Sequence, residues 1–444
     1  MTDRINTREL VLDILLAVTR DKEYSHTVIN GVLDKYSYLP KQERAFITRL
    51  SEGTLEHLIE MDYIIDGFSK TKVSKMKPVI RCILRMGVYQ LKYMDSVPNS
   101  ATCNEAVKLA QKRGFKGLKG FVNGVMRNIS RNLDQFRMPE EKTEPGKYLS
   151  VCFSLPSWLA DKWILDYGYE QTKEMARAFM EPSRTVIRTN LLLTTPGELK
   201  KLLEGENVTV KPHPELEEAF VISGYDSLQS LRTFQEGLFY VQDTASMTAA
   251  RQLEAPKGAF VIDVCAAPGG KSIHMAEKLE GTGMVEARDL TDNKVELIEE
   301  NIRRCRLENI RARRMDATIK DEASVGKADI VIADLPCSGL GVIGRKPDIR
   351  YRITPEDIRE LAGLQRRILG VVQSYVKPGG LLLYSTCTVS REENQENAEW
   401  FEAQYPEFVL EDARQLFPKA GIQDGFYTAR FRKVKEWKKQ TSSH

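Results

Sequence analysis

The chain has 444 residues, of which 42% are hydrophobic and 29% are charged, and its formal net charge is +3. This length predicts two or three domains, each with enough apolar residues for a core. A net charge so close to zero excludes a uniformly basic chain, so a polyanion site must come from local clustering of charge. No run approaches the length of a membrane span, and the N-terminus lacks the apolar segment of a secretion signal. We therefore expect a cytoplasmic protein.

The seven cysteines form no paired CxxC motif, which argues against a zinc cluster or a disulfide framework. We expect no bound metal and a reducing compartment. Four of the cysteines lie among apolar or helical residues, where packing is the default role, namely Cys82, Cys103, Cys152 and Cys305.

Residues 1–131 have the apolar spacing of a helical bundle, with Thr7 as the expected first N-cap. Between Lys70 and Arg131, fourteen Lys or Arg residues stand against only two acids, Asp95 and Glu105. Such a stretch predicts a surface for a polyanion, and a solvated helical face is the alternative. Its densest part is a loop with Lys112, Arg113, Lys116 and Lys119.

Residues 132–150 are polar, contain Pro and Gly, and form the best candidate linker. A small α/β module follows, with strands expected near 185–192, 208–211 and 219–222 and a helix near 196–203. From residue 236 onward, strands and helices alternate at the spacing of parallel βαβ units. Strands are expected near 260–264, 284–288, 311–315, 328–333, 380–385 and 426–431.

Two of these strands are apolar, mostly β-branched runs that end in an acid, Asp263 and Asp334. Buried parallel strands of this kind bring their carboxylates to the carboxyl edge of the sheet, where ligands bind. Gly269 and Gly270 allow backbone to approach a ligand, and a helix from Ser272 is expected to direct its N-terminus there. The dinucleotide and Walker glycine patterns are absent, which argues against NAD and ATP.

The next two strands also deliver acids. Asp289 can accept from the ribose hydroxyls of a nucleoside, with a helix N-cap as the alternative. Asp316 ends the third expected strand, with an exposed turn as its alternative. Glu286 and Arg288 make the second strand unusually polar, which leaves its register open.

Two thiols are expected at the same edge. Cys337 follows Asp334 by three residues, and Cys387 ends a strand that begins after the turn at 377–380. A thiolate is the strongest ordinary side-chain nucleophile, while core packing is the alternative role for either cysteine. The loop after Cys337 carries basic residues suited to phosphate contact, with solvation as the alternative, namely Arg345, Lys346, Arg350 and Arg352. His274 is expected on a helix surface.

Three motifs, residues 263–271, Pro336-Cys337 and Thr386-Cys387, resemble those of the RNA (cytosine-5) methyltransferases that use S-adenosylmethionine. The helical region resembles NusB-like RNA-binding domains through residues 84–91, 97–98, 104–107 and 121–127, and Arg188-Thr189-Asn190 resembles the family's connecting module. The resemblance covers essentially the whole chain, and its closest form is the branch that acts on bacterial 16S rRNA.

The resemblance implies a multidomain fold. It places an all-α NusB-like bundle at residues 1–135, a small α/β connecting module at 150–235, and a Rossmann-like α/β class I methyltransferase domain at 236–444.

The resemblance also implies the roles of the site residues. Cys387 attacks carbon 6 of cytosine, Cys337 assists release, Asp334 relieves charge at ring N3, and Lys271 supports the base or the Asp. Asp316 faces the adenine of the cofactor. The implied binding site for S-adenosylmethionine consists of Asp263, Cys265, Ala266, Ala267, Pro268, Gly269, Gly270, Lys271, Asp289, Asp316 and Asp334.

The implied partner is 16S rRNA, either naked or in an early assembly intermediate, with a monomeric enzyme favoured and neither DNA nor membrane expected. A tRNA methyltransferase of the same chemistry is the first alternative. An RNA-binding adaptor with a vestigial catalytic fold is the second, against which the intact acids and cysteines argue. A DNA cytosine methyltransferase is a weaker third, because that family uses the Pro-Cys thiol as its nucleophile.

Overall fold

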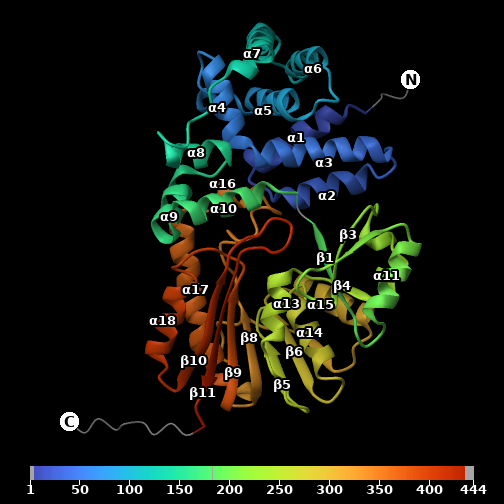
Figure 1. Cartoon of the computed structure of the whole chain (residues 1–444), viewed down its shortest axis with the longest axis vertical. Coiled ribbons are helices and arrows are strands. Elements are labelled where there is room, and N and C mark those ends of the chain that lie inside the picture. The colour runs from blue at the N-terminus through green and yellow to red at the C-terminus, as the bar shows by residue number, and fades with distance from the viewer. Residues whose placement is uncertain (1–4, 183, 436–444) are drawn as a thin grey trace, which may run out of the picture. The chain divides into compact units, whose positions relative to one another are not determined.

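The computed structural model describes residues 5–182 and 184–435, which form two compact units (Figure 1). The first unit takes in the chain up to Met180 together with Ile343–Arg352. The second holds Glu181–Val342 and the chain from Ile353 onward. The three-domain division expected from the sequence stays a prediction.

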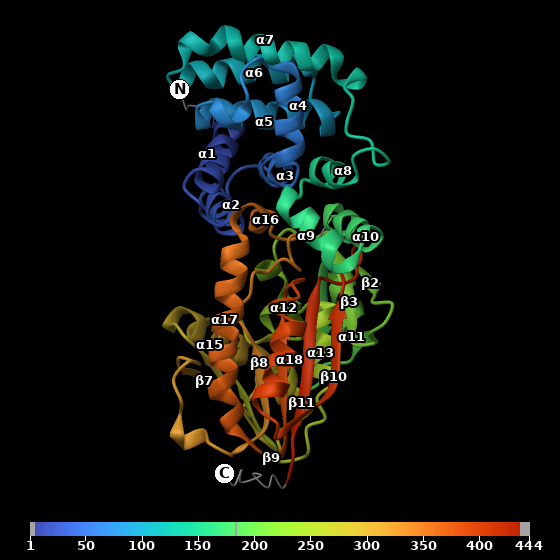
Figure 2. The same ribbon diagram turned by 90° about the vertical axis from the view of Figure 1, so that its left-hand side faces the viewer.

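The first unit is built from helices, which the sequence predicted for residues 1–131, and it also takes in the helices of residues 145–180. They are α1 (Thr7–Thr19), α2 (Ser25–Lys35), α3 (Lys41–Glu56), α4 (Leu58–Phe68), α5 (Pro78–Tyr93), α6 (Asn99–Lys112), α7 (Lys119–Asn132), α8 (Pro145–Cys152), α9 (Ser157–Tyr167) and α10 (Tyr169–Met180). Helix α5 lies among the other helices of this unit (Figure 2), contacts α1, α3, α4, α6 and α7, and has all of its residues 82–90 buried. The N-cap of α1 is Asn6 rather than Thr7, because the Asn6 side chain accepts from two backbone amides of the first turn.

One segment of this unit comes from far along the chain. Ile343–Arg352, which ends in the short helix α16 (Ile349–Arg352), packs among the N-terminal helices. Arg350 is fully buried in it and donates to the backbone oxygens of Phe153 and Ile343. The expectation that Arg350 contacts phosphate is therefore wrong, because its guanidinium is a structural link inside the unit.

The second unit contains a four-stranded antiparallel sheet of order β2-β3-β1-β4. Its elements are β1 (Thr185–Thr189), α11 (Pro196–Gly205), β2 (Thr209–Pro212), β3 (Ala219–Ser223), α12 (Arg232–Gln235) and β4 (Phe239–Val241). Arg188 of β1 pairs with Glu277 and donates to Gln242 (2.8 Å), while Asn190 donates to the backbone oxygens of Gly237 and Cys305. The Arg-Thr-Asn motif thus fastens the small sheet to the rest of the second unit.

The larger sheet has seven strands in the order β10-β11-β9-β8-β5-β6-β7. The five from β9 to β7 run parallel to one another, β11 is antiparallel to β9, and the edge strand β10 is antiparallel to β11. The strands are β5 (Phe260–Asp263), β6 (Met284–Asp289), β7 (Ile310–Arg314), β8 (Ala328–Asp334), β9 (Val376–Thr386), β10 (Phe408–Leu416) and β11 (Phe426–Lys433). The mostly parallel sheet confirms the predicted α/β fold.

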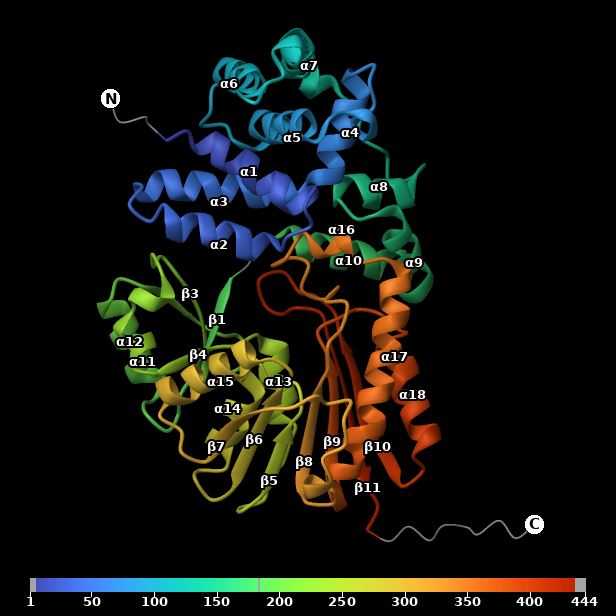
Figure 3. The same cartoon turned by 180° about the vertical axis from the view of Figure 1, so that it is seen from behind.

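Helices cover both faces of this sheet (Figure 3). They are α13 (Thr244–Arg251), α14 (Gly270–Lys278) and α15 (Asp292–Cys305) on one side, and α17 (Pro355–Val372) and α18 (Gln395–Gln404) on the other. Neighbouring strand residues alternate between the two cores, so that Val261 packs in the first and Ile262 in the second. Burial of both faces explains why the strands read as continuous apolar runs.

Two features of this sheet differ from expectation. Residues 377–380 belong to β9 instead of a separate turn, with a register shift against β8 between Ala328 and Ile330. Strand β10 was not predicted, because its charged residues, such as Glu411 and Asp412, are those of a sheet edge.

In the described ranges, no helix has both the length and the apolar character needed to cross a membrane.

Candidate active site

The carboxyl ends of the parallel strands meet at one edge of the seven-stranded sheet, and the predicted acids lie there. Asp263, Asp289 and Asp334 are the last residues of β5, β6 and β8. Asp316 follows the end of β7 by two residues. The sequence placed all four at this edge because parallel strands leave their carboxyl ends together.

The loop from Val264 to Gly269 joins β5 to α14, whose first residue is Gly270 rather than Ser272. Gly269 has φ +107°, a conformation that only glycine adopts without strain, and its amide closes a turn onto Ala266. The carbonyl of Pro268 accepts from the Tyr240 hydroxyl at 3.0 Å. This loop therefore has one fixed path at the edge of the sheet.

Asp263 lies beneath this loop and is 1% exposed. Its Oδ2 accepts from the Ser272 hydroxyl at 2.6 Å, whereas its Oδ1 is buried without a hydrogen-bond partner. Burial raises the pKa of Asp263 to about 7, and the nearby Asp334 carboxylate adds to that rise. A buried acceptor with an unused oxygen suits a ligand that brings its own donor.

Asp289 and Asp316 have different surroundings. Asp289 is buried, and its carboxylate accepts from the backbone amide of Ala267 at 3.0 Å and pairs with Lys294 at 3.0 Å. Asp316 is half-buried and accepts from the backbone amide and the hydroxyl of Thr318, which lower its pKa. Asp289 thus ties the loop from Val264 to Gly269 to β6, while Asp316 holds the turn after β7 with one carboxylate oxygen.

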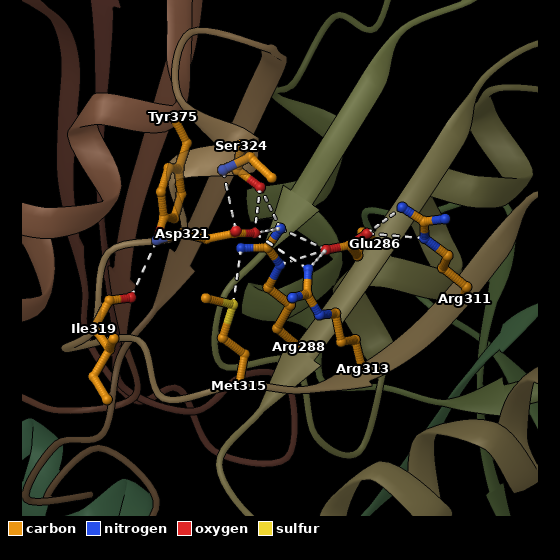
Figure 4. A network of polar contacts seen from close by, with 10 residues as sticks. Glu286, Arg288, Arg311, Arg313, Met315, Ile319, Asp321, Ser324 and Tyr375 are labelled. Atoms are coloured by element: carbon orange, nitrogen blue, oxygen red, sulfur yellow. Dashed lines mark hydrogen bonds and ion pairs between the residues drawn. The ribbon is translucent and has the colours of Figure 1, made fainter.

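A polar network fixes the register of β6, which the sequence left open (Figure 4). The Arg288 guanidinium is 2% exposed and donates to Glu286 (2.7 Å) and Asp321 (3.1 Å). Asp321 also pairs with Arg313, and its backbone amide donates to the Tyr375 hydroxyl. Paired charges explain how two ionic residues occupy a central strand, and they anchor the segment that follows Asp316.

Lys271, near the start of α14, directs its ammonium at Asp334 with an Nζ–Oδ2 distance of 2.5 Å. The other oxygen of Asp334 accepts from the Ser385 hydroxyl at 2.8 Å. The Lys271 side chain is 7% exposed and also lies over the Phe426 ring. Asp334 itself is 30% exposed, so one carboxylate is both oriented by protein donors and open to a substrate.

The two predicted thiols meet at this edge. The Sγ atoms of Cys337 and Cys387 are 3.3 Å apart, and both cysteines are free. The hydrogen bond with Cys387 raises the pKa of Cys337 well above that of an ordinary thiol, and burial adds to the rise. Cys337 therefore keeps its proton and can donate it toward the Cys387 sulfur.

A buried carboxylate that the sequence analysis missed lies behind the thiols. Glu393 is fully buried and accepts from both the backbone amide (2.8 Å) and the hydroxyl (2.5 Å) of Ser338, the residue after Cys337. The same hydroxyl lies 2.7 Å from that of Thr388, the residue after Cys387. Gln365 of α17 joins Glu393 to the carbonyl of Pro336.

Backbone contacts bring the same two loops together. The amide of Gly341 donates to the carbonyl of Cys387 at 3.1 Å, and an added Cβ at Gly341 would lie 2.1 Å from the Gly425 oxygen. Only glycine permits this approach. The Thr386 hydroxyl donates to Asn394 at 2.6 Å, so both cysteines are flanked by groups bonded inside the protein.

These residues fit S-adenosylmethionine, which carries an ammonium group, ribose hydroxyls, an adenine amino group and a sulfonium charge. Carboxylates at three strand ends match those donors and cations, and the unused Oδ1 of Asp263 supplies one acceptor directly. Asp316, two residues after the end of β7, would add a further carboxylate. The glycine loop leaves room for close approach of a ligand to backbone.

His274 is 6% exposed in α14, so its expected place on a helix surface is wrong. Its Nδ1 has no hydrogen-bond partner, and burial lowers its pKa well below that of a free imidazole. A neutral imidazole packed in the core adds no acid or base to the site.

The basic surface of the first unit is smaller than the sequence count indicated, because acids from other helices neutralise part of it. Lys112 pairs with Glu9 (2.5 Å), and Arg113 pairs with Glu9 (3.5 Å) and Asp13 (2.5 Å). Lys116 is exposed and forms no ion pair within the ranges that the structure describes. Four more pairs within the stretch are Lys72–Asp66, Arg85–Asp62, Lys92–Glu60 and Lys108–Glu105.

Comparisons with known proteins match all three parts of the chain. The family model described as 16S rRNA methyltransferase RsmB/F matches residues 250–432, the NusB family matches 5–131, and the RsmF/B-like ferredoxin-like domain matches 155–228. The solved structure titled "Crystal Structure of PH0851" is 25% identical, has a TM-score of 0.80, and covers 97% of this chain and 99% of its own.

Two curated relatives are similar over nearly their full length. One from Bacillus subtilis, described as a probable ribosomal RNA small subunit methyltransferase B, is 35% identical over 97% of this chain and 99% of its own. The ribosomal RNA small subunit methyltransferase B of Vibrio cholerae is 29% identical over 92% of this chain and 93% of its own. S-adenosylmethionine is the methyl donor of such enzymes, which confirms the predicted cofactor. The chain belongs to the ribosomal RNA small subunit methyltransferase B family.

Proposed function

We propose that this chain methylates carbon 5 of one cytosine in 16S rRNA through a covalent bond between Cys387 and carbon 6 of that base. The observation that carries this proposal is the pair of thiols 3.3 Å apart, at the sheet edge that also presents Asp334 and the cofactor loop. A single buried cysteine would be ordinary packing, whereas two adjacent thiols beside an oriented carboxylate are an arrangement suited to nucleophilic catalysis.

The covalent step is needed because carbon 5 of cytosine is a weak nucleophile. When the Cys387 thiolate adds to carbon 6, electron density moves to carbon 5, which can then attack an electrophilic methyl group. S-adenosylmethionine supplies that methyl group when bound. Cys337, held in its thiol form, donates a hydrogen bond that stabilises the Cys387 thiolate before attack.

Asp334 and Lys271 assist the same attack through ring N3 of the base. The Lys271 ammonium and the Ser385 hydroxyl fix the Asp334 carboxyl group, and its 30% exposure leaves it accessible to ring N3. When Asp334 carries a proton, its hydrogen bond to N3 drains charge from the ring during attack. The carboxyl group is in place before the reaction, so it contributes without reorganisation.

The contact between the two sulfurs determines when the methylated base is released from Cys387. The hydrogen bond with Cys387 and burial both raise the pKa of Cys337, and bonding of the Cys387 sulfur to carbon 6 removes the first and larger of these two influences. Cys337 then gives its proton to solvent, and its thiolate takes the proton from carbon 5. The double bond between carbons 5 and 6 re-forms, and Cys387 leaves as a thiolate. One proton is released overall, and the starting state is restored.

We also propose that the cofactor site consists of the residues expected from the sequence, namely Asp263, Cys265, Ala266, Ala267, Pro268, Gly269, Gly270, Lys271, Asp289, Asp316 and Asp334. We propose a cytoplasmic monomer as the active form.

Bisulfite sequencing of rRNA and tRNA from a deletion strain tests which RNA is the substrate. Loss of one 5-methylcytosine from 16S rRNA is the expected result. Loss from tRNA instead would favour the tRNA enzyme, and unchanged methylation of both would favour the adaptor.

Asp289→Asn is expected to weaken binding of S-adenosylhomocysteine by about tenfold, or about 1.4 kcal/mol. The amide keeps the shape of the side chain but loses the charge and one acceptor oxygen for ribose hydroxyls. Isothermal titration measures the affinity. Asp292→Asn, an exposed acid three residues along the chain, is the matched control and should leave it unchanged. Wild-type affinity in Asp289→Asn would remove this acid from the cofactor site.

Charge reversal at Lys116 and Lys119 to Glu is expected to weaken RNA binding and flatten its salt dependence. Each lost phosphate contact should reduce the slope of log affinity against log salt by about 0.7 to 0.9. Fluorescence anisotropy with labelled rRNA fragments at several salt concentrations measures both quantities. Reversal of Lys112 and Arg113 should change the slope less, because Glu9 and Asp13 already neutralise them. An unchanged slope in the first variant would make this loop a solvated face.

A further inference from the structure

The first unit contains a partly open cavity of about 420 Å³ that the proposed chemistry does not use. Its walls come from α1, α3, α4 and α5 and from the inserted segment Ile343–Arg352, all within one compact unit. Four of its lining residues are basic, namely Lys22, Arg81, Arg85 and Arg352, and one is acidic, Asp348. The cavity therefore has an excess of positive charge.

Two of these five charges are already used inside the fold. Asp348 is 2% exposed and accepts from the backbone amide and the hydroxyl of Ser25, the first residue of α2. It takes the place of a cap at this helix, whose N-cap residue Tyr24 makes no side-chain bond. Arg85 donates twice to Asp62, at 2.6 Å each.

The other three basic residues also line the cavity, and two of them have a buried donor without a hydrogen-bond partner. Arg81 Nε is buried without a hydrogen-bond partner. Arg352 Nη1 is likewise buried without a hydrogen-bond partner, although the guanidinium pairs with the Asp348 carboxylate at 3.7 Å and lies over the Tyr24 ring. Lys22 forms no ion pair among the residues that the structure describes. Buried guanidinium donors without an acceptor are unfavourable, so an anion is the group that satisfies them.

We propose that this cavity seats a phosphodiester group of the RNA substrate, held by Arg81, Arg352 and Lys22. The choice of RNA rests on the proposed function. Guanidinium groups match phosphate oxygens with paired donors, and phosphate contacts set the register of a bound strand. The inserted segment begins six residues after Cys337, so the phosphate would be held by the stretch of chain that leads directly away from the release thiol.

The test compares Lys22→Gln and Arg81→Gln with the wild-type chain in binding to single-stranded rRNA fragments. Each substitution should reduce the slope of log affinity against log salt by about 0.7 to 1. Arg81→Lys, which keeps the charge, should restore most of the affinity and separates charge from packing. The matched control is Arg20→Gln, because Arg20 lies two residues from Lys22 and is neutralised by Asp21.

Three outcomes decide the matter. If the wild-type chain methylates RNA and both cavity variants bind RNA with unchanged slopes, the cavity proposal is overturned and the proposed function stands. If the cavity variants weaken RNA binding but the wild-type chain methylates no RNA, the cavity proposal stands and the catalytic proposal fails. If inorganic phosphate raises the wild-type Tm at matched ionic strength while RNA affinity ignores both substitutions, the occupant is a free anion and the RNA proposal is overturned.

Discussion

Cys337→Ala is expected to accumulate a covalent protein–RNA adduct that survives denaturing gel electrophoresis when S-adenosylmethionine is present. The variant keeps the Cys387 nucleophile, so attack on carbon 6 and methyl transfer still occur. It lacks the thiolate that removes the proton from carbon 5, so Cys387 stays bonded to the base. Turnover should fall on the order of 10³-fold, while a slow-migrating band containing both protein and RNA appears.

Cys387→Ala should give the opposite pattern, with neither methylation nor adduct, because no sulfur remains to attack. Cys152→Ala is the matched control, since this half-buried cysteine lies in α8 of the first unit, and it should behave as wild type. A band from Cys387→Ala and none from Cys337→Ala would reverse the two roles and indicate the arrangement of the DNA enzymes.

The rate of adduct formation should also depend on whether the target cytosine is paired. A base must leave its stack to reach a thiol, at a cost of a few kcal/mol that is smaller in a loop. Adduct formation by Cys337→Ala should therefore be faster on an unpaired cytosine than on the same cytosine in a duplex. Equal rates would show that extrusion of the base does not limit attack.

The sequence predicted the position of the acids and thiols well, because strand ends are local features. An apolar run that ends in Asp263 or Asp334 places its carboxylate at the carboxyl edge whatever the rest of the chain does. The distance between the Cys337 and Cys387 sulfurs could not be predicted in this way. It depends on the register of β8 against β9 and on the contact between Gly341 and Cys387.

The features that the sequence analysis did not predict depend on tertiary contacts. Lys112 and Arg113 looked like free charge because their partners, Glu9 and Asp13, lie about 100 residues earlier in the chain. Glu393 was not singled out from the sequence, since its partner Ser338 is 55 residues away. A local pattern carries no record of such pairings, which only the packed fold creates.

Glu393→Ala is expected to lower kcat by about 10²-fold while leaving cofactor affinity unchanged. The substitution removes the acceptor for the amide and hydroxyl of Ser338 and for Gln365. Both thiol loops lose a shared support, and misplacement of a reacting group by about 1 Å costs roughly this much in rate. Left without an acceptor, the buried donors should also lower the free energy of unfolding by about 3 kcal/mol.

Glu393→Gln separates position from stability. Its amide oxygen still accepts from Ser338, but its NH₂ group faces donors where the second carboxylate oxygen stood, so we expect a loss in kcat of about tenfold with most of the stability kept. Single-turnover methylation measures the chemical step, isothermal titration the cofactor affinity, and thermal denaturation the stability. Glu396→Gln, an exposed acid in the first turn of α18, is the matched control. A wild-type kcat in Glu393→Ala would show that the two loops hold the thiols together without this carboxylate.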